Sequence, residues 1–349
     1  MDLPFLVSIL NRYCMPHLAD SWDNVGLLVE PSVPLQVRKV LVTNDLTEPV
    51  LDEAVSTQSN LILSYHPPIF TPIKRIVQRQ WKDRIVARCL ENRIAIFSPH
   101  TGLDAKQGGV NDWLLSPLEV ANVRALTAAP FSQSLFSLDV PINEKFSQFC
   151  LNSGVSVTDC HLSSSGSRVA KVTCSAAHID SVLAEASNSG VTIISKSLLP
   201  EVDTKAEGYG RIAHLKFSVS LSTVIEAYKK LFKADRLLVA LGIGKTIDDP
   251  VNVVAVCAGS GGSILCRNPM ALTADVFVTG EMSHHDRLEA ISRGISVIIA
   301  GHSTSERGYL EQQLIPDLQA FIRTSSDGDS STGVQIQMSK QDREPGCLM

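Results

Sequence analysis

Short apolar runs rich in β-branched residues alternate with amphipathic helical patterns along much of the chain. In the first third, strands are expected at residues 39–43, 60–64 and 94–98, with helices at 49–58 and 81–92 between them. Such alternation is typical of βαβ units, in which helices join parallel strands and cover the sheet. The pattern therefore predicts an α/β core with a mostly parallel or mixed sheet.

The same rhythm returns in the last third of the chain. Strands are expected at residues 251–257, 274–279 and 295–300, with a helix at 285–293. In both regions a strand leads into a loop that carries a histidine, and a second Ile-rich strand then leads to another histidine, His100 or His302. We interpret the two regions as related halves whose strand ends face each other, where ligands collect in α/β proteins. Chance similarity of two βαβ units is the alternative.

The region between the two halves has its own pattern. Strands are expected at residues 136–140, 155–162, 167–174 and 191–197, and helices at 144–152 and 177–188. Two successive βαβ-like units of this size indicate an inserted ferredoxin-like α+β domain. The expected domains are core subdomain 1 at 1–125, the inserted domain at 126–204 and core subdomain 2 at 205–349.

The connections in the second half are also predicted. Residues 201–207 read as the linker back to the core, which resumes with a strand at 211–217 and a helix at 221–232. The Ser-, Gly- and Asp-rich stretch 325–332 is expected to be a mobile loop before a last edge strand at 334–338.

Composition excludes several classes of protein. The 349 residues are 44% hydrophobic and 19% charged, and the net charge of -5 gives no electrostatic footprint for phosphate backbones. Direct binding to nucleic acid is therefore not expected. No apolar run reaches the roughly 18 residues of a membrane span, and the acidic N-terminus favours an amphipathic helix over a signal peptide. We expect a cytoplasmic protein and leave a nuclear or organellar fraction open.

Four segments place histidine or carboxylate side chains in a turn directly after an expected strand. They are Leu63-Ser-Tyr-His66-Pro-Pro-Ile-Phe70, Phe97-Ser-Pro-His100-Thr-Gly-Leu-Asp104-Ala105, Gly280-Glu-Met-Ser-His-His-Asp286 and Gly301-His302-Ser-Thr-Ser-Glu306-Arg-Gly308. A divalent metal site needs imidazoles and carboxylates that converge from several strand ends. The repetition of this design therefore predicts a metal centre.

Each of these residues also has a structural explanation. A histidine after a strand is commonly a hydrogen-bonded structural residue, and Asp104 is placed to bind its own backbone in a turn. Ser303 and Glu306 fit the capping box, in which the glutamate returns to the N-cap residue. The two explanations of Glu306 are compatible, because His302 and Glu306 are four residues apart and share one helix face.

At these residues the chain resembles the Nif-three-like family, also described as the type two GTP cyclohydrolase family, and its animal members in particular. The resemblance extends over nearly the whole sequence. It is carried by Ser21-Trp-Asp-Asn-Val-Gly-Leu-Leu-Val29, Leu61-Ile-Leu-Ser-Tyr-His-Pro-Pro-Ile-Phe70, Thr279-Gly-Glu-Met-Ser-His-His-Asp286 and Ser305-Glu-Arg-Gly308. It implies two related α/β subdomains with an inserted domain, a ring-like homo-oligomer and a dinuclear metal centre.

The resemblance also implies the metal ligands, which are His66, Asp104 as a bridging carboxylate, His302 and Glu306. The chain departs from bacterial members at Tyr65, where those have a second histidine. Tyr65 is thus a further candidate ligand, and we expect one or two divalent metal ions per chain. Mixed imidazole and carboxylate ligands are compatible with Zn, Fe, Mn, Co or Ni.

Two functions from different classes follow from the resemblance. As a metal-dependent hydrolase acting on a nucleotide-like or phosphorylated small molecule, the protein would use Glu281, His284 or His285 for proton transfer. As a non-catalytic interaction protein, it would contact transcriptional regulators and act as a corepressor with a structural metal. A closed ligand sphere favours the second function and an open coordination position favours the first.

Overall fold

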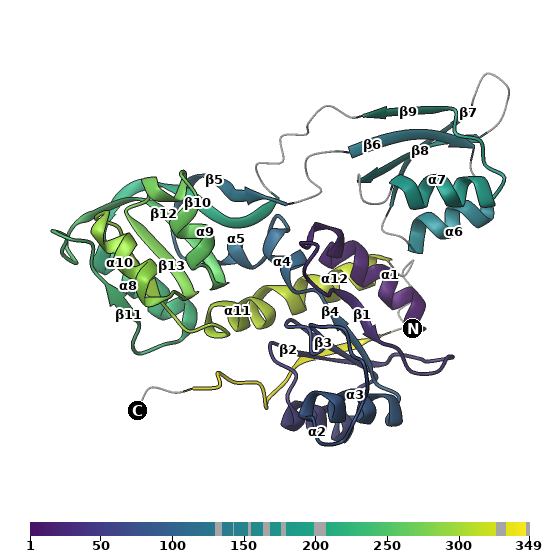
Figure 1. The fold of residues 1–349 in the computed structure, drawn as a ribbon, viewed down its shortest axis with the longest axis horizontal. Helices are drawn as coiled ribbons and strands as arrows, with labels where there is room; N and C mark the ends of the chain where they lie inside the picture. Colours follow the sequence, from purple (N-terminus) through teal and green to yellow (C-terminus); the bar gives the residue numbers. More distant parts are fainter. Residues whose placement is uncertain are drawn as a thin grey trace.

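The strands of the protein form three sheets, two in the core and one in the inserted domain (Figure 1). The computed structural model describes residues 1–129, 135–141, 143–152, 155–162, 168–175, 179–198, 207–325 and 333–346. The expected linker at 201–207 and the expected loop at 325–332 lie almost wholly outside these ranges.

The first core sheet has the strand order β1-β4-β3-β2-β15. Its strands are β1 (Gly26–Val29), β2 (Lys39–Thr43), β3 (Leu61–Ser64), β4 (Ala95–Ser98) and β15 (Gln335–Met338). β1 is antiparallel to β4, whereas the remaining neighbours are parallel. Helices α2 (Glu48–Ser56) and α3 (Trp81–Glu91) make the crossovers between the parallel strands.

The second core sheet has the strand order β11-β14-β13-β12-β10-β5. Its strands are β5 (Val120–Ala128), β10 (Gly208–Ser220), β11 (Leu238–Ala240), β12 (Pro250–Ser260), β13 (Val276–Glu281) and β14 (Ser296–Ile299). The strands β12, β13 and β14 are parallel, and β11, β10 and β5 are antiparallel to their neighbours. The crossovers are α9 (Gly262–Arg267) with the short turn η2 (Ala271–Thr273), and α10 (His284–Ser292).

The two core sheets share one topology over four strands. In each, an edge strand lies antiparallel to the third strand of a parallel β-α-β-α-β unit, giving the matching orders β1-β4-β3-β2 and β11-β14-β13-β12. A short helix then follows the third parallel strand in both, α4 (Thr101–Ala105) in the first half and α11 (Thr304–Tyr309) in the second. The prediction of two related α/β halves is confirmed.

Alternation of side chains along the strands explains how the sheets pack. In β2, Val40 and Val42 join the central core, whereas Leu41 lies on the outer face with α2 and α3. In the second sheet Val278 likewise faces the central core, and Phe277 faces outward to α9 and α10. Because successive side chains of a strand point to opposite faces, each sheet buries both of its faces.

A layer of helices lies between the two sheets. It includes α1 (Leu3–Cys14), α5 (Val110–Leu115), α8 (Leu221–Phe232), α11 and α12 (Ile315–Ser325), with a π-helical turn, η3 (Leu310–Leu314), joining the last two. In Figure 1, α11 and α12 extend between the sheets from the second half toward α1. α1 is the expected amphipathic helix, and it begins where Asp2 accepts a hydrogen bond from the amide of Phe5. None of the helices described is long and apolar enough to cross a membrane.

The inserted domain is a ferredoxin-like unit set apart from the core sheets (Figure 1). Its elements are β6 (Leu135–Pro141), α6 (Glu144–Asn152), β7 (Ser156–Leu162), β8 (Arg168–Ser175), α7 (Ile179–Asn188) and β9 (Ser195–Leu198). The antiparallel order β7-β8-β6-β9 brings the first and last strands together, as in the split βαβ arrangement.

Two sequence expectations about strands need correction. Residues 120–128 form β5, for which no strand was expected, and β10 is longer than the expected 211–217. β5 continues beyond residue 125, where the first subdomain was expected to end. Most of its side chains are partly or fully exposed, so it lacks a clear apolar alternation and is held by its pairing with β10. The domain boundaries themselves stay predictions.

The junction between β10 and the first half contains a buried ion pair. The guanidinium of Arg211, 1% exposed, donates to both carboxylate oxygens of Asp112 at 2.9 and 3.0 Å. It also donates to the carbonyls of Gly208, Gly210 and Lys106. Because a buried guanidinium is costly without a counter-charge, this network fixes α5 against β10.

We expect Asp112→Ala to lower the free energy of unfolding by about 3 kcal/mol, because it leaves the charge of Arg211 buried and unpaired. Urea denaturation followed by circular dichroism measures the loss. Glu119→Ala is the control, since Glu119 pairs with Lys216 at 3.9 Å on the surface and its loss should cost less than about 0.5 kcal/mol. Equal losses in the two variants would contradict this account.

Candidate metal centre

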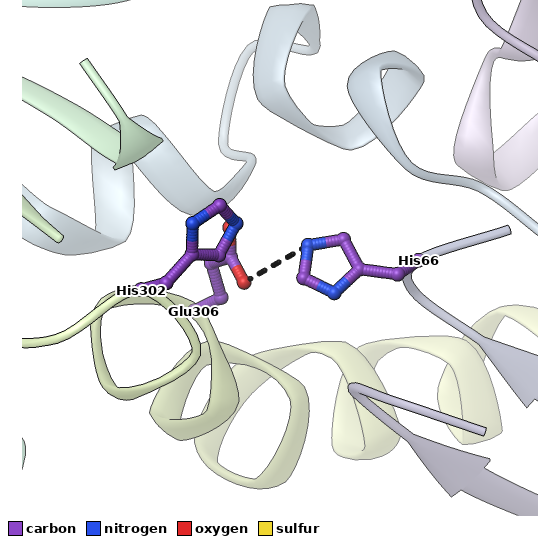
Figure 2. Close-up of side chains that lie close together, drawn as sticks. All are labelled: His66, His302 and Glu306. Carbon is purple, nitrogen blue, oxygen red and sulfur yellow. Dashed lines mark ion pairs between the residues drawn. The ribbon is translucent and has the colours of Figure 1, made fainter. Parts of the chain in front are cut away.

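His66, His302 and Glu306 converge from the two halves of the core. His66 follows β3, His302 follows β14, and Glu306 lies in the first turn of α11. One ligand atom from each lies within 4.8 Å of the others. The Nε2 atom of His66 is 3.4 Å from one oxygen of Glu306, and the Nε2 atom of His302 is 3.6 Å from the other. Figure 2 shows the carboxylate of Glu306 between the two imidazoles.

Carboxylates fix the orientation of the imidazoles through their Nδ1 atoms. The pairs are His66 with Asp45 at 2.9 Å, His302 with Glu281 at 3.1 Å and His100 with Asp23 at 2.7 Å. Metal-binding histidines are commonly held in this way, because the carboxylate fixes the ring and leaves Nε2 free for the ion. For His66 and His302, the free Nε2 faces Glu306.

The charges around His66 are strongly coupled. Burial by itself lowers the pKa of His66, but the hydrogen bonds from its ring to Asp45 and Glu306 outweigh burial and raise that pKa to about 10. For Asp45 burial acts in the other direction and raises the pKa. Hydrogen bonds from His66, Ser303 and Asn44 outweigh burial and lower that pKa to about 2. Without a metal ion, a proton on His66 therefore supplies the positive charge that the carboxylates require.

The environment of Glu306 fits a divalent cation. Its side chain is 3% exposed, and in the described part of the chain its carboxylate has no Lys or Arg partner. Asn44, which is fully buried, donates from Nδ2 to Glu306 at 3.0 Å. The Oδ1 atom of Asn44 has no hydrogen-bond partner among the described residues. A buried carboxylate, two imidazoles and a spare amide oxygen form a donor set that a divalent metal ion satisfies.

Asp104 and Tyr65 lie beside this group and bind each other. The phenol of Tyr65, 1% exposed, donates a short hydrogen bond to Asp104. Burial is the main cause that raises the pKa of Asp104 to about 6. Asp104 is not one of the residues whose ligand atoms lie within 4.8 Å of one another. Its predicted bridging role, and a ligand role for Tyr65, stay predictions.

The C-terminal segment ties the two halves together around this site. Asp342 accepts hydrogen bonds from the amide of Asn44 at 2.9 Å and from the guanidinium of Arg307 at 3.1 Å. Glu344 accepts from the amide of Thr304 at 2.9 Å, at the start of α11. The loop after β2 and the first turn of α11 are therefore held by one segment.

Comparisons with known proteins agree over the whole chain. The sequence profile of the family described as Duf34/NIF3 (NGG1p interacting factor 3) matches residues 1–345. The chain belongs to the NIF3 family. NIF3-like protein 1 from Rattus norvegicus is 42% identical, with 99% of this chain and 92% of the relative covered. NGG1-interacting factor 3 from Saccharomyces cerevisiae is 27% identical, with coverages of 97% and 93%.

A solved structure supports the same conclusion. The crystal structure of a Bacillus cereus protein related to NIF3 superposes with a TM-score of 0.72 at 25% identity, and the match covers 100% of this chain and 99% of that chain. The two-subdomain α/β fold is therefore shared with a bacterial protein of the NIF3 family.

The three residues suggested for proton transfer in this NIF3-family chain differ in their placement. Glu281 contacts the site through Nδ1 of His302. His284 and His285 are exposed at the start of α10, and the centroids of their two rings are 5.4 Å apart. Among the described residues, neither imidazole contacts His66, His302 or Glu306. A catalytic role for His284 and His285 stays a prediction that no contact supports.

The related halves supply equivalent residues to the site. His100 and Asp104 follow β4, and His302 and Glu306 follow β14, with the same four-residue interval between histidine and carboxylate. The capping box expected at Ser303 is absent, because the hydroxyl of Ser303 donates to Asp45 at 2.9 Å and does not cap the helix. The carboxylate of Glu306 therefore faces the imidazoles. Internal repetition is therefore visible in the site as well as in the sheets.

Sequence reasoning missed the residues that orient the ligands. Asn44 and Asp45 directly follow β2, and Asp23 precedes β1 in the Trp-Asp-Asn-Val-Gly stretch. The first two stand at a strand end, like the other residues of the site. His100, which the sequence did indicate, is the partner of Asp23, and its φ of 31° is a strained conformation for a residue with a side chain.

Gly259 gives a direct test of the geometry, because a Cβ atom there would lie 2.6 Å from Oε1 of Glu306 and 3.2 Å from Nε2 of His302. We expect Gly259→Ala to weaken metal binding at least about tenfold, measured by competition with a chromogenic chelator. Gly244→Ala is the matched control, since Gly244 also has a positive φ but no neighbouring atom within 4 Å. If both variants bind metal like the parent, the ion is not held by Glu306 and His302.

Metal affinity should depend on pH through His66. The proton on His66 competes with the ion below a pKa of about 10, so affinity should rise about tenfold per pH unit between pH 7 and 9. Asp45→Asn removes the negative charge that stabilises the protonated ring, lowers that pKa and should flatten the dependence. Calorimetric titrations at several pH values measure both slopes. Equal slopes would show that a proton on His66 is not displaced.

Proposed function

We propose that this protein is a divalent-metal-binding hydrolase that acts on a nucleotide-like or phosphorylated small molecule. The observation that carries the proposal is the buried carboxylate of Glu306 between the Nε2 atoms of two imidazoles whose Nδ1 atoms are bound by carboxylates. Carboxylates bound to Nδ1 are typical of imidazoles that hold a metal ion through Nε2.

His66, His302 and Glu306 would hold the ion, and Asp104 is a further candidate ligand. Three protein donors leave coordination positions open for water and substrate, which is typical of catalytic rather than structural sites. When bound, a divalent ion lowers the pKa of water and polarises the group under attack. The proposal covers one or two ions per chain and leaves the choice among Zn, Fe, Mn, Co and Ni to measurement.

The remaining residues of the site have positioning roles in this proposal. Glu281 fixes the ring of His302 through Nδ1, and Asp45 does the same for His66. Asn44 holds Glu306 through its amide nitrogen. Glu281 is largely exposed, so it is also placed to exchange a proton with solvent.

A second candidate function is a protein-interaction role as a transcriptional corepressor. The interaction part of this role is favoured by the name of the yeast relative, NGG1-interacting factor 3. This chain also exposes apolar side chains on and after the edge strand β11, at Leu238, Leu241, Ile243 and Ile247. Exposed apolar groups of this kind suit a partner protein or another copy of the chain in a homo-oligomer. Cytoplasmic and nuclear fractions are both part of this proposal.

Metal content and hydrolysis, measured together, separate the two functions. We expect one or two ions per chain by elemental mass spectrometry, and metal-dependent turnover in a screen of nucleotides and phosphoesters. The His66→Ala/His302→Ala variant should lose at least about 90% of both. His214→Ala, at an exposed histidine of β10, is the control and should retain them.

Other results for metal content and turnover would each reject a specific part of the proposal. Bound metal without turnover of any compound would reject the hydrolase and leave the interaction role with a structural ion. Equal metal content in the parent and the double variant would reject the site itself. Loss of metal in the control as well would show that the preparation, and not the histidine pair, determines occupancy.

A further inference from the structure

Two exposed aromatic side chains form a rim beside the metal-binding group. Trp22 is 57% and Phe70 is 44% exposed, and their ring centroids are 6.0 Å apart. His100 lies 6.2 Å from Trp22 and 6.5 Å from Phe70, and its ring is 5.4 Å from His66. A continuous series of rings therefore leads from the surface to the site.

The rim is held in place by residues adjacent to its aromatic groups. Asp23, next to Trp22, binds His100 at 2.7 Å and the amide of Thr101 at 3.2 Å. Asn24 donates to the carbonyl of Ile69, next to Phe70. Large apolar rings that are exposed although their backbone is anchored are typical of a surface formed for a ligand.

A cationic cavity adjoins the rim. It has a volume of about 370 Å³, is formed by residues from 68 to 86 and shares Phe70 with the rim. Four cationic side chains line it, namely Lys74, Arg75, Arg79 and Lys82. Its one acidic residue, Asp83, is engaged by the amide of Val77 at 2.9 Å. No metal-binding residue lines this cavity.

The cations of the cavity have no acidic partners in the described part of the chain. The neighbouring Arg84 and Arg88, by contrast, are paired with Glu48 and Asp52. Four positive charges against the single negative charge of Asp83 stand out in a chain whose net charge is -5. Such a group attracts a compact anion, and phosphate matches guanidinium and ammonium donors.

We propose that the rim and the cavity bind one small ligand that carries both a planar aromatic group and a phosphate. The planar group stacks on Trp22 and Phe70, and the phosphate enters the cavity among Lys74, Arg75 and Arg79. This inference rests on the proposed function, since it names the substrate class of the same site. The phosphate is held away from the metal-binding group, so it serves recognition and is not the group that is hydrolysed.

A small molecule fits these features better than a nucleic acid. The four cationic side chains line one cavity, and its volume of about 370 Å³ lies at the lower end of the range for small-molecule sites. Proteins that bind nucleic acid commonly present a longer basic groove and an overall positive charge. The experiment therefore also compares mononucleotides with a short RNA.

The test is calorimetric titration of the full-length protein with AMP, GMP, CMP and UMP, and with the nucleoside of whichever binds tightest. We expect at least one nucleotide to bind, and its nucleoside to bind at least tenfold more weakly. Lys74→Gln/Arg75→Gln/Arg79→Gln should weaken nucleotide binding at least tenfold. The control Lys245→Gln/Arg236→Gln/Arg267→Gln, with the same change of charge at exposed positions elsewhere, should change it less than twofold.

Further variants separate the parts of the proposal. Trp22→Ala should weaken nucleotide and nucleoside alike, whereas Trp22→Phe should retain most of the binding. The His66→Ala/His302→Ala variant should still bind the nucleotide within about threefold, because the metal group does not hold the phosphate. Melting curves and metal content of the rim and cavity variants are expected to match the parent, which ensures that a loss of affinity is local.

Several results would overturn the inference. These are no binding of any nucleotide, unchanged binding in the cavity variant, equal binding of nucleoside and nucleotide, or tighter binding of a ten-nucleotide RNA through the same residues. Release of inorganic phosphate during turnover would also contradict it. Nucleotide binding that depends on the cavity, without any turnover, would instead reject the hydrolase and retain the binding site.

Discussion

The carboxylate of Glu306 is the charge around which the two halves of this protein are arranged. It is almost fully buried, and its described partners are His66, His302 and Asn44. A carboxylate in such a place is costly unless positive charge neutralises it. His66 and Asn44 come from one half and Glu306 from the other, so this requirement also holds the halves together.

Repetition of one β-α-β-α-β unit explains why a site forms between the halves. Each unit ends in a histidine followed four residues later by a carboxylate, as in His100 with Asp104 and His302 with Glu306. The halves have since diverged, because Asp104 is engaged by the phenol of Tyr65 whereas Glu306 remains open to the imidazoles. One half thus contributes a carboxylate held by a phenol, and the other contributes the carboxylate that faces the imidazoles.

The C-terminal segment and the aromatic rim have different roles around the site. The C-terminal segment, through Asp342 and Glu344, holds the backbone around Asn44 and the start of α11. The rim of Trp22 and Phe70 connects the imidazoles, through His100, to a cavity lined by cationic side chains. Carboxylates surround the imidazoles at the centre, whereas Lys and Arg side chains line the cavity beside the rim, which suits a cation inside and an anionic ligand outside.

The sequence by itself determined the parts that depend on local periodicity. The strand β2, the helix α8 and the ferredoxin-like insertion follow from alternation and helical spacing, and histidine-bearing turns at strand ends indicated a metal site. The edge strand β5 was not visible, because it is stabilised by distant pairing with β10 instead of by an apolar pattern of its own. Only the tertiary structure decided which imidazole meets which carboxylate, since Asp23, Asp45 and Glu281 are 21 to 77 residues from their histidines. It also turned His284 and His285 toward solvent, because side-chain direction at a helix start depends on how that helix packs, which spacing along the chain does not specify.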